Sequence, residues 1–298
     1  MPHPTQLNAA RPRFAIAGAT GRVGSALITS LASDPIDLVA LTRKPAPDRF
    51  PSHVRQAAVD FDVPSTIQNA LEGVDRLFLA HGTSPRQTDN EIALIDAAVR
   101  VGVQHIVKLS VLGPPTRLHP FDWHARIEAH LGPQEIGYTI LRPSTFVDVL
   151  SRAARPVVED FWGGAAGDGE VNLIDTRDVA DCARATLLDR DSTHWQRAYH
   201  LTGPRSWRMA EVAEEMSRVL GRTVTYHQRT PEYQRTLLLE SGMSAFVADL
   251  LLGLDQAFRE SMLAETTSTV QALTGHAPRS LSNWLVDNAS LFGGGGRH

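Results

Sequence analysis

The chain has 298 residues, of which 42% are hydrophobic, and its 29 Lys and Arg against 33 Asp and Glu give a formal net charge of −4. Charges of both signs are interspersed, which excludes the basic surface that nucleic acids or anionic membranes require. The single cysteine, Cys182, excludes an internal disulfide and a cysteine-rich metal site, and no apolar run is long enough to span a membrane. We therefore expect a cytoplasmic protein without bound metal, with loose tails at residues 1–11 and 293–298.

The first half of the sequence alternates short apolar runs with amphipathic ones. The runs predict strands at Arg13–Ala17, Leu38–Thr42, Arg55–Val59, Arg76–Ala80, His105–Leu109 and Tyr138–Leu141. The amphipathic stretches predict helices at Arg22–Ala32, Val63–Leu71, Arg86–Arg100 and Asp122–Leu131. This alternation is typical of an α/β domain, a doubly wound parallel sheet with helices on both faces. Ligands of such sheets bind at the carboxyl ends of the strands.

The second half changes character after residue 150. The Gly-rich segment Phe161–Glu170 predicts a turn or loop. Further strands are predicted at Val171–Ile174, Tyr199–Leu201 and Thr223–His227. Further helices are predicted at Thr176–Leu188, Met209–Leu220, Pro231 to about Leu263, and from Leu281 after a loop at Thr274–Arg279. We expect a binding domain at 12–150, to which strands from about 171–201 return, and a smaller helix-rich lobe formed mainly by 151–292.

The segment Phe14–Gly24, FAIAGATGRVG, joins an apolar strand to a helix through glycines spaced by threes. Glycine allows a sharp turn and lets a dinucleotide pyrophosphate approach bare backbone, while the first helical amides point at the phosphates. A purely structural turn would also favour glycine, but the strand before it and the helix after it favour a cofactor. The residues expected to hold the pyrophosphate are Gly18, Thr20, Gly21, Arg22, Val23 and Gly24.

The end of the second predicted strand indicates which dinucleotide binds. Enzymes that use NAD place Asp or Glu there to hold the ribose 2′-hydroxyl, whereas this strand ends with Thr42, Arg43 and Lys44. A guanidinium binds a 2′-phosphate bidentately. The alternative is that Arg43 and Lys44 form a solvated surface pair. The sequence favours NADP(H), with Arg43 and Lys44 at its 2′-phosphate and Arg22 within reach of the same group.

Several motifs, taken in their order along the chain, indicate a similarity to a known protein family. They are GATGRVG, LVALTRKP, FLAHGTSP, VKLSVLG, HARIEAHL, YTILRPSTFVDVL, GDGEVNLIDTRDVADCA and YHLTGPRSWRMAEVAEEMSRVLGRTVTY. With them the chain resembles the NmrA-like family of atypical short-chain dehydrogenases, which includes NADPH-dependent quinone reductases, relatives of isoflavone reductase and NADP-sensing regulators. The resemblance implies a Rossmann-type sheet with a smaller C-terminal substrate lobe. It also implies that Thr83–Pro85 flank the adenosine and that Pro143–Phe146 line the nicotinamide. The remaining expected cofactor contacts are Asp60, His81, Thr83, Pro143 and Ser144.

The catalytic residues are harder to assign. Ordinary short-chain dehydrogenases use a Tyr-x-x-x-Lys pair on the helix after the fifth strand, with a Ser before it. If Glu128 matches the family's helix glutamate, His124 falls where the Lys would be and Pro120 where the Tyr would be. Ser110 matches the Ser. His124 is then a candidate proton donor, because an imidazole titrates near ~6.5; alternatively it only holds the cofactor ribose or a backbone carbonyl.

Two aromatic residues and one lysine complete the candidates. Phe146 and Trp162 could stack on a flat substrate, although aromatic side chains near a lobe junction also serve as core. Lys108 within the VKLS strand is expected to have a structural role. The first hypothesis is an NADPH-dependent reductase that transfers hydride to an activated, aromatic or polycyclic acceptor of the quinone or imine type. The alternatives are an NADP(H)-sensing regulator that acts through a protein partner and an isomerase or cyclase, and a homodimer is left open.

Overall fold

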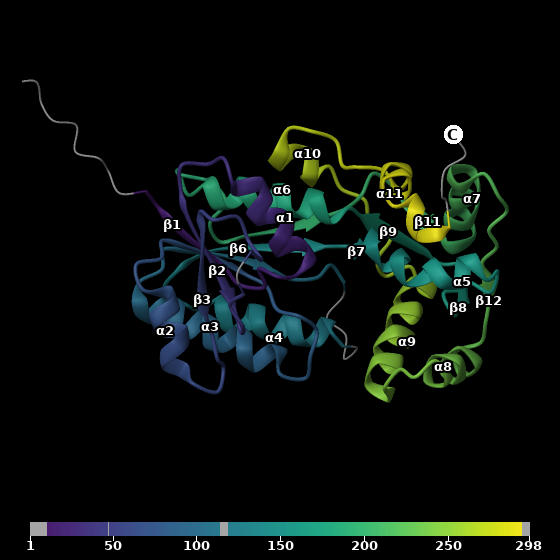
Figure 1. Ribbon diagram of the computed structural model, residues 1–298, viewed down its shortest axis with the longest axis horizontal. Coiled ribbons are helices and arrows are strands. Elements are labelled where there is room, and N and C mark those ends of the chain that lie inside the picture. The colour runs from purple at the N-terminus through teal and green to yellow at the C-terminus, as the bar shows by residue number, and fades with distance from the viewer. Residues whose placement is uncertain (1–10, 47, 114–118, 294–298) are drawn as a thin grey trace, which may run out of the picture.

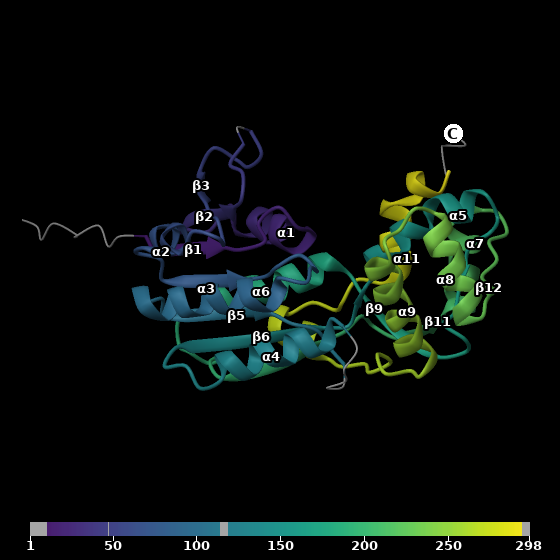
Figure 2. The ribbon, with the colours of Figure 1, turned by 90° about the horizontal axis from the view of Figure 1, so that it is seen from below.

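The protein was analysed as a computed structural model, which describes residues 11–46, 48–113 and 119–293 (Figure 1). Two lobes lie side by side. The first contains a sheet between two layers of helices, and the second is smaller and richer in helices (Figures 1 and 2). The α/β, doubly wound fold with a helix-rich C-terminal lobe is therefore confirmed. No helix in the described ranges is both long and apolar enough to cross a membrane.

The main sheet has seven strands, all paired in parallel, in the order β10-β6-β5-β4-β1-β2-β3. The strands are β1 (Arg13–Ile16), β2 (Asp37–Thr42), β3 (Val54–Ala58), β4 (Arg76–Leu79), β5 (His105–Leu109), β6 (Gly137–Pro143) and β10 (Arg197–Leu201). The chain proceeds outward from β1 to β3 and then returns to β4 on the other side of β1. The carboxyl ends of β1 and β4 therefore form the switch point at which such sheets bind ligands.

Helices cover both faces of this sheet. They are α1 (Arg22–Leu31), α2 (Pro64–Leu71), α3 (Gln87–Val101), α4 (Phe121–Leu131), α6 (Thr176–Leu188) and the short α10 (Thr269–Thr274). Figure 1 shows α1 and α6 above the sheet and α2, α3 and α4 below it. Phe14 and Ile16 of β1 pack in the core with α1 and α6, whereas Ala15 packs with the opposite layer. Because both faces are buried, the strands have continuous apolar sequences.

The second lobe has its own core. Its elements are β7 (Thr145–Phe146), the 3-10 helix η1 (Val147–Ala153), α5 (Ala154–Val158), β8 (Gly163–Gly164), β9 (Glu170–Ile174), β11 (Ser206–Arg208), α7 (Met209–Leu220), β12 (His227–Gln228), α8 (Pro231–Glu240), α9 (Ala245–Arg259), α11 (Leu281–Asp287) and the 3-10 helix η2 (Ala289–Phe292). A three-stranded sheet, β11-β9-β7, joins this lobe to the first. Of the later strands expected to return to the first domain, β10 joins the main sheet and β9 joins the small one.

Some expected elements differ from those observed. The strand predicted at Thr223–His227 is wrong, because only His227 and Gln228 pair, and their partner strand β8 is two residues long. Val224 is instead buried in the lobe core. The predicted helix from Pro231 is broken at 241–244 into α8 and α9, and α10 was not expected. The tails expected at 1–11 and 293–298 lie almost wholly outside the described residues.

A buried ion pair fastens the segment before α11 to α6. Asp178 accepts a 2.7 Å hydrogen bond from the backbone nitrogen of Arg279 and a second from its guanidinium. The same guanidinium donates to Asp181 at 2.9 Å. Asp178, Asp181 and His276 are close enough together to hold a metal ion. However, the guanidinium already supplies the positive charge there, and the cluster is accounted for as a structural clamp.

We predict that Asp178→Ala lowers the free energy of unfolding by about 2–4 kcal/mol, because it leaves two donors of Arg279 without their buried acceptor. Urea denaturation followed by circular dichroism measures this loss. A variant as stable as the wild type would show that Asp181 alone supplies the clamp.

Candidate functional site

The glycine loop lies at the switch point, where β1 turns into α1. Gly18 has a φ of +69°, and a Cβ there would lie 2.9 Å from the carbonyl oxygen of Ala80. A Cβ on Gly24 would lie only 2.2 Å from the carbonyl oxygen of Gly18. The fold itself therefore requires glycine at both positions, because α1 starts against the loop and the loop crosses the end of β4.

Gly21 is different, because the protein crowds it less than it crowds Gly18 and Gly24. Its backbone has a φ of −81° and a ψ of 172°, which any residue adopts, and a Cβ would approach only the Gly18 carbonyl oxygen, at 3.2 Å. Gly21 is the N-cap of α1 and supplies no side-chain cap. The amides of Arg22 and Val23 precede the first intrahelical hydrogen bond, from Ser25 to Gly21 at 2.9 Å. Bare amides at a helix start form a site for a pyrophosphate.

The adenosine side of the site lies beyond β2 and β4. Arg43 and Lys44 are exposed at the end of β2, and Asp60 is exposed after β3. His81 follows β4 and lies edge-on to Phe61, with 5.7 Å between ring centroids. The amide of Asn90 donates to His81 Nε2 at 2.9 Å, so the Nδ1–H donates to the Gly82 carbonyl at 2.6 Å. This fixes the ring as a wall of the site, and the exposed Thr83 follows it in the loop.

Arg22 points away from this 2′-phosphate side. Its Nε lies 3.7 Å from a carboxylate oxygen of Asp148, and its Nη2 lies 3.5 Å from the Ser151 hydroxyl, both in η1. The side chain is half exposed. In this structure, therefore, Arg22 connects the glycine loop to the second lobe, and Arg43 and Lys44 remain as the basic groups at the end of β2.

The expected nicotinamide and substrate contacts separate into two groups. Pro143 ends β6 at the site, and Phe146 is partly buried between the lobes. The hydroxyl of Ser144 instead donates to Asn172 in β9, at 2.9 Å to its carbonyl oxygen. Trp162 packs in the core of the second lobe, edge-on to Tyr226 at 5.0 Å. Ser144 and Trp162 thus contribute their side chains to packing in this structure.

His124, on α4, lies beside a buried ion pair. Lys108 of β5 and Glu91 of α3 are both 0% exposed, with 2.7 Å between Nζ and Oε2. Lys108 Nζ also lies 3.1 Å from His124 Nδ1. Burial and the nearby Lys108 charge lower the pKa of His124 well below its usual value, so the imidazole is neutral at pH 7. His124 remains partly exposed and can meet a ligand.

Ser110, at the end of β5, is held by a carboxylate. Its hydroxyl donates to Glu128 of α4, and Arg142 of β6 binds both oxygens of that carboxylate, with 3.1 Å from Nε to Oε1. A serine hydroxyl has one proton, so Ser110 meets a ligand here as an acceptor. His124 and Glu128 are four residues apart on α4, which places both on the side of the helix toward the sheet.

Sequence reasoning missed the partners of these two residues. Lys108 was expected to be structural, and Glu91, Gln87 and Arg142 were not singled out. One signal was available, because Lys108 lies within an apolar strand and Glu91 stands directly before the apolar run Ile92–Ile95 of its helix. A charge in such a place is buried only when paired.

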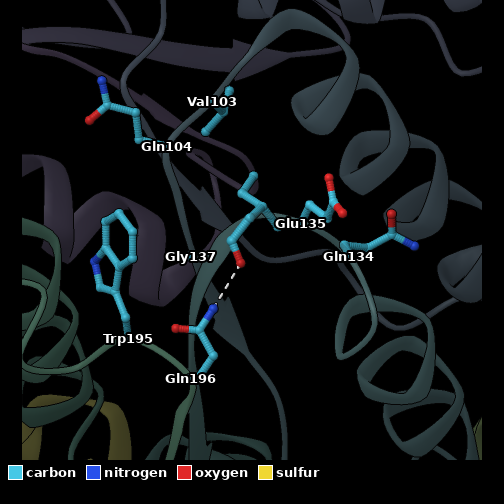
Figure 3. Close-up of a pocket in the computed structure, with 8 residues that line it drawn as sticks. Val103, Gln104, Gln134, Glu135, Gly137, Trp195 and Gln196 are labelled. Atoms are coloured by element: carbon cyan, nitrogen blue, oxygen red, sulfur yellow. Dashed lines mark hydrogen bonds between the residues drawn. The ribbon is translucent and has the colours of Figure 1, made fainter.

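A separate cavity lies at the opposite end of the strands, where β5, β6 and β10 begin (Figure 3). Its lining residues precede β5, β6 and β10 and include Val103, Gln104, Glu135 and Trp195. Gln196 crosses it to donate to the Ile136 carbonyl at 3.0 Å. The cavity is at the amino ends of the strands, where parallel sheets do not place their ligands, so it is not part of the candidate site.

Comparison with known proteins agrees with this geometry. A family described as NAD(P)H-binding matches residues 18–190. The NAD(P)H azoreductase of Xenophilus azovorans is 30% identical over 93% of this chain and 98% of its own length. The crystal structure of the NADPH-dependent quinone oxidoreductase of Escherichia coli, complexed with NADPH, has a TM-score of 0.84 and 26% identity over 93% of this chain and 99% of that one. The regulator NmrA in complex with NADP has the same fold, with a TM-score of 0.77 and 16% identity over 96% of this chain and 98% of that one.

Fold, glycine loop and family match define an NAD(P)H-dependent reductase. The chain belongs to the NAD(P)H-binding family, and it shares its fold with the quinone oxidoreductase of Escherichia coli and with NmrA. The resemblance drawn from the motifs is thereby confirmed. When the cofactor is bound, its nicotinamide supplies a hydride. The parts of this chain that would hold the cofactor are the glycine loop, the basic end of β2 and the ends of β5 and β6.

We predict that Gly21→Ala and Gly24→Ala separate cofactor binding from folding. Gly21→Ala changes stability by only about 1 kcal/mol, since its φ and ψ accept a side chain and the Gly18 carbonyl oxygen needs to move only slightly. It weakens NADPH binding about tenfold by intruding on the phosphates. Gly24→Ala lowers stability by about 1–3 kcal/mol through its backbone clash. Thermal unfolding and NADPH fluorescence titration measure the two effects. Equal binding by wild type and Gly21→Ala would remove Gly21 from the phosphate site.

Proposed function

We propose that the protein reduces an activated, aromatic or polycyclic acceptor of the quinone or imine type with NADPH. The observation that carries this proposal is the place of His124 on α4, where its Nδ1 lies 3.1 Å from Lys108 Nζ and where burial and that charge lower its pKa. At the start of the same helix, Pro120 occupies the position at which the resemblance expects a catalytic Tyr. A neutral imidazole is a weak acid. The acceptor must therefore draw the hydride by its own electron demand, as a quinone or an iminium does and a simple ketone does not.

The roles of the remaining residues follow from their places. The amides after Gly21 hold the pyrophosphate, and Arg43 and Lys44 bind the 2′-phosphate. Pro143 and Phe146 frame the nicotinamide and the flat acceptor, while His124 donates a proton from Nε2. The similarity to an azoreductase and a quinone oxidoreductase supports the acceptor class.

The direct test is NADPH oxidation, followed at 340 nm, with a panel of quinones, imines, azo compounds and simple ketones. The proposal requires turnover with the activated acceptors and none with the ketones. Tight NADP(H) binding without turnover of any acceptor would instead favour a cofactor-sensing regulator, the alternative that the missing Tyr leaves open.

We predict that Arg43→Ala raises the KM for NADPH about 10–100-fold, because it removes charge-assisted hydrogen bonds to the 2′-phosphate. The KM for NADH, which lacks that phosphate, should stay within about twofold. Arg155→Ala is the matched control, since Arg155 is an exposed arginine of the second lobe that pairs with Glu159. Equal losses for both cofactors would assign the 2′-phosphate to another group.

We predict that His124→Ala lowers kcat for a quinone about 100-fold with little change in the KM for NADPH, as expected for loss of a general acid. Steady-state kinetics between pH 6 and 9 measures the effect. Unchanged turnover across this range would leave His124 a purely structural residue.

A further inference from the structure

Burying the pair of Lys108 and Glu91 costs free energy of desolvation, and the pair has no role in the function proposed so far. Both side chains are fully buried, in β5 and α3, directly beneath the candidate site. Removing two charges from water costs several kcal/mol per ion, and well-packed apolar residues often serve stability as well. The pair is therefore better explained by its position than by the stability it adds, because Lys108 lies in contact with His124, the imidazole proposed to donate a proton.

The protons of this cluster can be assigned from its contacts. An ammonium has three N–H groups and no acceptor. Lys108 Nζ faces the Glu91 carboxylate at 2.7 Å, the Leu109 carbonyl oxygen, and His124 Nδ1 at 3.1 Å. The Glu91 Oε2 contact is an ion pair without hydrogen-bond geometry. Because an ammonium cannot accept a hydrogen bond, the contact with His124 is one that Nζ donates and Nδ1 accepts. Since a neutral imidazole carries one proton, that proton lies on Nε2 of His124.

Within the described residues, the Nε2–H of His124 has no protein acceptor. Its Nε2 lies 3.3 Å from the amide nitrogen of Gln87, which is itself a donor and gives a hydrogen bond to Glu91 at 2.9 Å. The amide oxygen of Gln87 also has no partner in the described part of the chain. A donor without an acceptor on a partly exposed ring is available to a bound acceptor molecule.

We propose that Lys108 supplies protons to His124, so that the two side chains act as a relay during reduction; this rests on the proposed function. With a quinone or a neutral imine, hydride arrival leaves a negative charge on the oxygen or nitrogen of the acceptor, whereas a cationic iminium becomes neutral and needs no proton. The Nε2–H bond of His124 breaks as its proton moves to that atom, and a proton passes from Lys108 Nζ to Nδ1. Lys108 is left as a neutral amine. A proton from water, entering at the partly exposed imidazole, then restores the ammonium.

The surrounding charges are consistent with this relay. Lys108 from β5 and Glu91 from α3 face His124, and Glu128 on its own helix is neutralised by Arg142 of β6. Burial and Lys108 disfavour the imidazolium, and the relay never forms it, because one proton arrives at Nδ1 as the other leaves Nε2. Glu91 and Lys108 act through His124 and are positioning residues.

The arrangement can be tested without turnover, by nitrogen-15 NMR of histidine-labelled protein free of cofactor, with His124→Ala to assign the signal. The expected result is a neutral His124 protonated at Nε2 between pH 6 and 8. In Lys108→Met/Glu91→Gln, which removes both charges together, the pKa of His124 should rise. A wild-type imidazole protonated at Nδ1, or an imidazolium at pH 7, would overturn the proposal.

The relay itself is tested with two acceptors that differ in proton demand. A naphthoquinone needs a proton after hydride transfer, whereas a cationic triarylmethane dye becomes neutral without one. For Lys108→Met/Glu91→Gln we expect kcat at pH 8 to fall at least about tenfold with the quinone, with partial recovery at pH 6, and to change less than about twofold with the dye. Lys108→Arg should keep the tautomer but lose turnover with the quinone, because a guanidinium does not release its proton.

Asp178→Ala serves as the control for destabilisation, since it removes a buried ion pair outside the site. A loss of kcat with the quinone that is equal at pH 6 and 8 in a folded double variant, or a Lys108→Arg variant as active as wild type, would contradict the relay. Failure of the wild type to reduce any acceptor would contradict the proposed function instead, while the tautomer measurement would still decide the proton assignment.

Discussion

The closeness of β1, its loop and α1 is the constraint on which the structure depends. Gly24 lies so near the Gly18 carbonyl that no side chain fits between them, and Gly18 itself passes over the end of β4 at Ala80. This packing aims the start of α1 at the switch point of the sheet. The bare amides of α1, the basic end of β2 and the carboxyl end of β5 are brought to one side of the molecule as a result.

The second lobe is joined to the first by a small sheet, an ion pair and an aromatic stack. The sheet β11-β9-β7 continues the chain from the end of β6, and Asp178 clamps the segment before α11 to α6. On the other side of the site, Trp123 of α4 stacks against Phe246 of α9, with 6.1 Å between ring centroids. Helix α4 therefore carries both His124 and a contact between the lobes, so the position of His124 depends on how the lobes pack.

A structural feature of this protein can be predicted from the sequence when the residues that form it are adjacent or follow a regular pattern. The inner strands of the main sheet are largely apolar because both faces of the sheet are buried, and all seven strands were predicted within about two residues. The two-residue strands β8 and β12 have no periodicity to detect, and the six-residue α10 is too short to show a clear amphipathic pattern. The glycine loop was predictable because all its residues are adjacent in sequence. The cluster of Lys108, Glu91 and His124 was not, because three separate elements supply it.

The chemistry proposed for the site follows from a neutral imidazole, His124, as the proton donor. A Tyr whose pKa is lowered by a Lys can protonate an ordinary alkoxide as it forms, and the helix here begins with Pro120 at the place where the resemblance expects such a Tyr. An imidazole that burial keeps neutral gives up its Nε2 proton only to a strongly basic atom. Such an atom exists only after the hydride has arrived. Under the proposed function, hydride transfer comes first and is driven by the acceptor, so we expect this site to accept electron-poor, conjugated molecules and to reject simple carbonyl compounds.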